Sequence, residues 1–123
     1  MQQLTKSLSE PKLYRIVAIF LTLASLALSL TPGDPTKIST IPHLDKLIHL
    51  GAYASLYGAY WYGFISPNKK HHSLPLALGI CFYSGSLEVL QSWMDLGREG
   101  DFWDFVANSF GIFFVYFGVR LLR

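Results

Sequence analysis

The chain has 123 residues, of which 51% are hydrophobic and 15% are charged, and its formal net charge at pH 7 is +2. Its positive mean hydropathy is unusual for a soluble domain of this size, whose core would have to hide long apolar runs. The scattered Lys and Arg residues exclude a nucleic-acid-binding surface, and a single cysteine, Cys81, excludes an intrachain disulfide or a cysteine-based zinc site.

Four apolar runs are long enough to cross a membrane, because the hydrocarbon core takes roughly 17 to 25 helical residues to span. They cover about residues 13–30, 44–65, 74–94 and 102–122. The first run ends at Pro32, which lacks the backbone donor that a continuing helix needs, and the second ends before Pro67. We predict an all-α fold, with residues 1–123 forming one integral membrane bundle of four transmembrane helices.

The basic residues predict the orientation of this bundle. Lys and Arg in short flanking segments are retained on the cytoplasmic side of a membrane. Seven of the ten Lys and Arg residues lie before or at the start of the first run, between the second and third runs, or near the end of the chain: Lys6, Lys12, Arg15, Lys69, Lys70, Arg120 and Arg123. Both termini are therefore predicted to be cytoplasmic, and the connections 31–43 and 95–101 to face outward.

The first run permits a second interpretation, as a secretory signal. The basic residues before it resemble the charged start of such a signal, and Ala27-Leu28-Ser29 could serve as a cleavage site. The run is longer than a usual signal core, which favours a retained helix. Cleavage would leave three helices in the same orientation.

Ionisable and amide side chains gather near the predicted outer ends of the last three runs. At membrane depth such a charge costs several kcal/mol unless it is paired or faces a water-filled cavity. Asp45, His49 and Tyr53 recur every four residues, so they follow one helix face. We expect one polar site shared by three helices, built from Asp45, Lys46, His49, Tyr53, Glu88, Gln91, Asp104 and Asn108, with Arg98 in the outer connection.

A separate pattern of small residues marks another face of the second predicted helix. Gly51, Ser55, Ala59 and Gly63 recur at every fourth position. Small side chains let two helix backbones approach closely in a membrane. This face is predicted to pack closely against a neighbouring helix.

The polar residues also form an ordered set of motifs. These are Asp45-Lys46-Leu47-Ile48-His49 followed by Tyr53, then Glu88-Val89-Leu90-Gln91, then Gly97-Arg98, and finally Asp104 with Asn108-Ser109-Phe110-Gly111. In order and helical placement the chain resembles the VanZ-like family of bacterial membrane proteins, named for an accessory determinant of teicoplanin resistance. The resemblance covers about residues 42–111. It implies a multi-pass protein of the bacterial plasma (inner) membrane with a role in the cell envelope and in glycopeptide susceptibility.

Three functions are compatible with these residues. In the first, the outward polar site recognises a cell-wall precursor or a glycopeptide, or docks an envelope protein, beside membrane lipid. In the second, the protein is a hydrolase or transferase acting on a lipid-linked or surface substrate, with His49 or Glu88 as general acid or base and with Arg98 and Lys46 holding an anionic phosphate. In the third, the charges only fix the register of the bundle.

No cofactor or metal is expected from the sequence. A set of His49, Glu88 and Asp104 could bind a metal, but one histidine with two carboxylates is a poor match to the usual histidine-rich sets. The adjacent His71 and His72 are interpreted as part of a solvated cytoplasmic loop.

Overall fold

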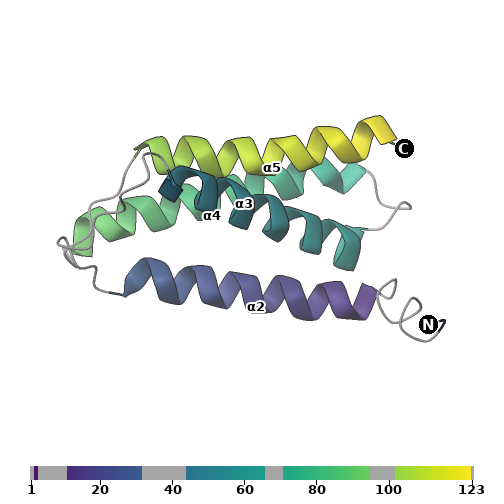
Figure 1. Cartoon of the computed structure of the whole chain (residues 1–123), viewed down its shortest axis with the longest axis horizontal. Coiled ribbons are helices and arrows are strands. Elements are labelled where there is room, and N and C mark those ends of the chain that lie inside the picture. The colour runs from purple at the N-terminus through teal and green to yellow at the C-terminus, as the bar shows by residue number, and fades with distance from the viewer. Residues whose placement is uncertain (1, 3–10, 32–43, 66–70, 95–101, 123) are drawn as a thin grey trace.

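The structure, a computed structural model, is all-helical, as the sequence predicts (Figure 1). It describes residues 2, 11–31, 44–65, 71–94 and 102–122. The helices are α2 (Pro11–Leu30), α3 (Leu44–Tyr60), α4 (Ser73–Met94) and α5 (Phe102–Leu122), and α3 continues into a π-helical turn, η1 (Trp61–Ile65). Successive helices run in opposite directions, so the start of α2 and the end of α5 lie at the same end of the bundle (Figure 1).

Charged residues at the helix ends agree with the helix dipole. Asp45 lies in the first turn of α3 and Asp104 in the first turn of α5, where a carboxylate is stabilised by the free backbone N–H groups. Arg120 lies in the last turn of α5, where a cation is favoured. The same two acids belong to the predicted polar site, so they orient the helices as well as contribute to it.

Three of the described helices are long and apolar enough to cross a membrane: Pro11–Leu30, Ser73–Met94 and Phe102–Leu121. Their outer surfaces carry large apolar side chains, including Phe82, Trp93 and Leu121, which are 80%, 81% and 86% exposed. A water-soluble protein rarely exposes so much contiguous apolar surface. This apolar surface is therefore suited to contact with lipid, and on this ground the chain is a membrane protein.

The core lies mainly between α3 and α5, whose backbones approach most closely at Gly111. A Cβ atom on Gly111 would collide with the carbonyl oxygen of Leu50. Below this crossing the core is aromatic: Tyr57 and Trp61 are fully buried, and both hydrogen-bond to Ser73 of α4. This packing fixes α3 against both α4 and α5, and thereby sets the position of the polar residues one or two turns away.

The predicted packing of Gly51, Ser55, Ala59 and Gly63 is found for only two of the four residues. Gly51 and Ser55 are exposed, and a Cβ atom on Gly51 would meet no described atom within 4 Å. Only the second half of the pattern packs, since Ala59 and Gly63 are buried and a Cβ atom on Gly63 would lie 2.9 Å from the backbone nitrogen of Arg15. The neighbour there is α2, which crosses only this half of the helix.

Helix α2 lies along one side of the bundle (Figure 1) and is attached mainly by polar contacts. Among its described residues only Ala18 is buried. Side chains along its length bond to the other helices: Arg15 Nε to Gly63 O at 2.7 Å, Thr22 Oγ1 to Tyr60 Oη at 2.6 Å, and Ser25 Oγ to Tyr83 Oη at 2.8 Å. Such bonds suit a lipid environment, where apolar packing alone drives helix association weakly.

Candidate functional site

The polar residues of α3, α4 and α5 meet at one end of the bundle, where α3 and α5 begin and α4 ends (Figure 1). One candidate metal-ligating atom from each of His49, Glu88 and Asp104 lies within 4.8 Å of the other two. We call the polar cluster the set Lys46, His49, Ser84, Glu88, Asp104 and Asn108. Because its members come from three helices, the cluster exists only in the assembled bundle.

Lys46 bridges two carboxylates. Its Nζ lies 2.7 Å from Asp104 Oδ1 and 2.7 Å from Asp45 Oδ2. The Asp104 side chain is 16% exposed and that of Asp45 is 57% exposed, so the inner pair is screened less by water. Lys46 therefore occupies one oxygen of Asp104, while the other, Oδ2, lies 3.7 Å from His49 Nε2.

Two buried residues, Asn108 and Ser84, position the His49 side chain. Its Nδ1 lies 3.0 Å from Asn108 Oδ1, and Asn108 Nδ2 donates to Ser84 Oγ at 2.7 Å. Asn108 and Ser84 are both fully buried. With the Asn108 amide in this orientation its oxygen accepts from His49 Nδ1, and Nε2 is the ring nitrogen that faces Asp104.

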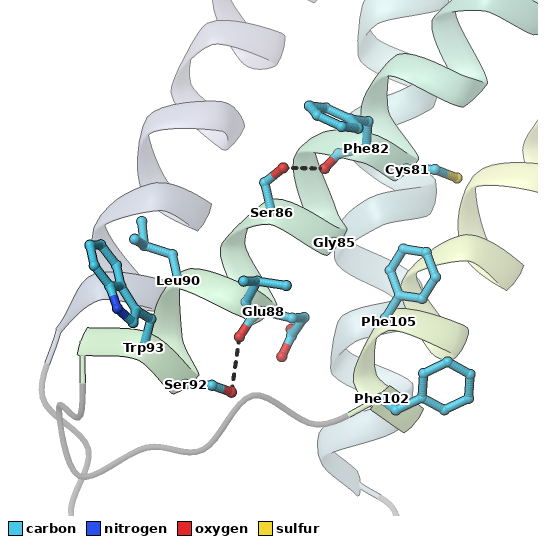
Figure 2. A pocket seen from close by; sticks show the side chains of 11 residues that line it. Cys81, Phe82, Gly85, Ser86, Glu88, Leu90, Ser92, Trp93, Phe102 and Phe105 are labelled. Atoms are coloured by element: carbon cyan, nitrogen blue, oxygen red, sulfur yellow. Dashed lines mark hydrogen bonds between the residues drawn. The ribbon is translucent and has the colours of Figure 1, made fainter.

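Glu88 connects the polar cluster with a groove between α4 and α5. The groove has a volume of about 790 Å³, and its wall is largely apolar, with Phe82 and Val89 from α4 and Phe102 and Phe105 from α5. Figure 2 shows Glu88 on α4 with the two aromatic rings of α5 across the groove from it. A ligand in this groove would meet apolar side chains along most of its length and a carboxylate at the polar cluster.

The other predicted site residues have different positions. Tyr53 is 5% exposed and hydrogen-bonds to Ser84, so it adjoins the polar cluster, whereas Gln91 donates from Nε2 to the backbone oxygen of Ser29 on α2 at 2.9 Å. Asp45 lies at the water-exposed edge of the cluster. Arg98 lies outside the described residues.

Ser84 is the residue of the polar cluster that sequence reasoning missed. It precedes Glu88 by four positions in α4 and therefore lies on the same face of that helix. This spacing was available in the sequence, but a serine in an apolar helix usually bonds to its own backbone, as Ser86 does to Phe82 O. Only the position of Asn108 gives Ser84 its role.

The polar cluster and Asp45 carry an excess of negative charge. Three carboxylates, those of Asp45, Glu88 and Asp104, face one ammonium group, that of Lys46. Because Lys46 is already bound to two of them, it is poorly suited to hold a phosphate as well. The described part of the site therefore favours cations and hydrogen-bond donors over anions.

No protein-family model matches the chain. No curated protein and no solved structure matches it either. The resemblance to the VanZ-like family therefore rests on the motif residues named above.

Proposed function

We propose that this chain is a multi-pass protein of the bacterial plasma membrane whose polar cluster, at the extracytoplasmic end, recognises a component of the cell envelope. The observation that carries the proposal is the meeting of His49, Glu88 and Asp104, from three apolar helices, at one end of the bundle. Charged groups in such helices are costly unless they serve a partner or each other. Their position beside a groove that lipid or a ligand could enter favours a partner.

The proposed outward position of the polar cluster belongs to a four-span topology with both termini in the cytoplasm. The 17 residues of α3 and the 5 of η1 form one continuous helical segment, long enough to span the hydrocarbon core, which takes roughly 17 to 25 residues. The start of α2 and the end of α5 lie at one end of the bundle (Figure 1), and basic residues flank both. The positive-inside rule assigns that end to the cytoplasm and the polar cluster to the outer side.

The groove indicates what kind of component would bind. A long apolar wall ending at a carboxylate suits an amphipathic molecule, with its apolar part in the groove and a cationic or hydroxyl-bearing part at Glu88. The resemblance to the VanZ-like family favours a component that affects glycopeptide (teicoplanin) susceptibility, such as a cell-wall precursor or the antibiotic itself.

An enzymatic role is the second candidate, and the arrangement around His49 favours it. A histidine oriented through Nδ1 by Asn108 and facing a carboxylate through Nε2 has the geometry of a general acid or base, and Glu88 beside it lines the groove. In this version the protein is a hydrolase or transferase acting on a lipid-linked substrate at the outer leaflet.

The topology is tested with reporter fusions. A cytoplasm-active reporter fused after Asn68 is expected to be active, and one fused after Gly97 inactive, with a periplasm-active reporter giving the reverse pattern. Activity of the cytoplasmic reporter after Gly97 would contradict an outward polar cluster.

The functional role is tested by substitution in a bacterial host that needs the protein for its teicoplanin response. Glu88→Gln and His49→Ala are each expected to reduce the response to that of a strain lacking the protein, at unchanged membrane levels. Ser55→Ala serves as the control and is expected to be neutral, because Ser55 is exposed on α3 away from the groove and bonds to the backbone of its own helix.

A full response from both variants would mean that the cluster has only a structural role.

If both variants lose the response, turnover distinguishes an enzyme from a binding protein. Purified protein incubated with membrane lipids and wall precursors releases a product of changed mass only if it is catalytic.

A further inference from the structure

The geometry points to a divalent-cation site formed by His49 Nε2, the Glu88 carboxylate and Asp104 Oδ2, one ligand from each of three helices. We infer that it binds a first-row transition-metal ion such as Zn²⁺. This revises the sequence-based expectation of no metal. It does not depend on the proposed function, because a cation could bind here whatever the protein recognises.

The distances are close to those of a metal site. The three candidate ligand atoms lie within 4.8 Å of one another, and His49 Nε2 is 3.7 Å from Asp104 Oδ2. Around a zinc ion, with ligands at about 2.0–2.2 Å, neighbouring ligand atoms are roughly 3.0–3.6 Å apart. The side chains would therefore close by on the order of 1 Å, which rotation of partly exposed Glu and Asp side chains supplies without moving a helix.

The orientation of His49 gives a second, geometric reason to place an ion here. Asn108 Nδ2 donates to Ser84 Oγ, so the Asn108 oxygen faces His49 Nδ1, and Nε2 is the ring nitrogen that faces Asp104. The 3.7 Å between Nε2 and Asp104 Oδ2 is too long for a direct hydrogen bond. A metal ion bound by both atoms would bridge them.

The other hydrogen bonds of His49 and Asp104 resemble those that support metal ligands in proteins. Histidines that bind metals donate their other N–H to an oxygen, and ligating carboxylates are themselves hydrogen-bonded. Here His49 Nδ1 is held by Asn108, and Asp104 Oδ1 is held by Lys46 Nζ at 2.7 Å. Both contacts leave the metal-facing atom of each ligand available.

The net charge of the site and the types of its ligand atoms determine which ion it would bind. The three carboxylates of the site and its edge outnumber the single ammonium group of Lys46, so a dication reduces the local charge imbalance. One imidazole nitrogen with carboxylate oxygens suits Zn²⁺ better than Mg²⁺, which prefers oxygen ligands in an octahedron and keeps its waters. We expect Zn²⁺ to bind and Mg²⁺ to compete weakly.

The test is isothermal titration of Zn²⁺ into the full chain in lipid nanodiscs, prepared without a polyhistidine tag. The other three histidines, His43, His71 and His72, are replaced by Ala, so that His49 is the only one left. One Zn²⁺ per chain is expected to bind, with affinity at least about 100-fold lower after Asp104→Asn, which removes a direct ligand.

Asp45→Asn provides a matched control. Asp45 contacts the same Lys46 at the same 2.7 Å distance as Asp104 but lies outside the three-ligand set, so its loss is expected to leave Zn²⁺ affinity nearly unchanged. Glu88→Gln, on another helix, gives a second loss-of-ligand variant if Asp104→Asn does not fold. Circular dichroism and gel filtration establish that each variant is folded.

Nitrogen NMR of His49 supplies a readout that does not depend on these variants. Zn²⁺ is expected to shift the Nε2 signal far more than the Nδ1 signal, because Nε2 is the proposed ligand atom and Nδ1 faces Asn108. The proposal is overturned by the absence of 1:1 binding, by equal affinities for the Asp104→Asn and Asp45→Asn proteins, or by a Zn²⁺ titration that leaves Nε2 unchanged.

Discussion

Replacing Gly111 with Ala is expected to lower the free energy of unfolding by roughly 3 kcal/mol, at the upper end of overpacking effects. The added Cβ atom would collide with the carbonyl oxygen of Leu50 and lie 3.1 Å from the backbone nitrogen of Ala54. Backbone atoms cannot rotate away, so α3 and α5 would have to separate. Since Lys46 and His49 on α3 bond to residues of α5, the same displacement would open the polar cluster.

The matched control is Gly118→Ala, two turns further along α5. A Cβ atom there would meet no described atom within 4 Å. Because Ala favours a helix by up to about 1 kcal/mol over Gly, this variant is expected to be neutral or slightly more stable. Unfolding of both proteins in mixed micelles, followed by circular dichroism, measures the difference. Equal stability would contradict the close crossing of α3 and α5.

Replacing Asn108 with Leu is expected to lower the free energy of unfolding by roughly 2–4 kcal/mol. The change removes the Asn108 partner of His49 Nδ1 and one of the two partners of the Ser84 hydroxyl, which keeps Tyr53, and each unsatisfied buried polar group costs about 1–3 kcal/mol. Ser109→Ala is the control on the same helix, because Ser109 Oγ bonds to the backbone of its own helix at Phe105 O. Its expected effect is within about 0.5 kcal/mol.

A double-mutant cycle isolates the Asn108–Ser84 bond. Removing both polar groups together costs less than removing one and leaving the other buried. The protein carrying Asn108→Leu and Ser84→Ala is therefore expected to be more stable than the sum of the two single effects predicts. Additive effects would mean that the bond makes no net contribution to stability.

The helices themselves were predictable because their signals are local. The third and fourth predicted runs, 74–94 and 102–122, correspond to Ser73–Met94 and Phe102–Leu122. Length and continuous hydropathy determine these ranges. The second run was predicted as one regular helix, whereas its last five residues form the π turn η1. That turn involves the buried Trp61, and its bond to Ser73 of a different helix is not visible in a local pattern.

The composition of the polar cluster was less predictable, because it depends on how each helix is rotated about its axis. Glu88 and Gln91 were both predicted to belong to the polar site, but residues three apart in an α-helix differ in direction by about 60°. Glu88 consequently lies with His49 and Asp104, while Gln91 bonds to Ser29 on α2. Which neighbour occupies each direction is a property of the assembled bundle.

Helix α2 is attached to the bundle by polar contacts, whereas the other three helices form the polar cluster. The described residues of α2 contribute no side chain to the polar cluster, and their hydrogen bonds to the other helices include those of two hydroxyls, one guanidinium and two backbone oxygens. The chemistry is thus complete in three helices. The α2 segment is the part of the chain most open to replacement by another apolar helix, provided that the substitute offers matching donors and acceptors along the contact.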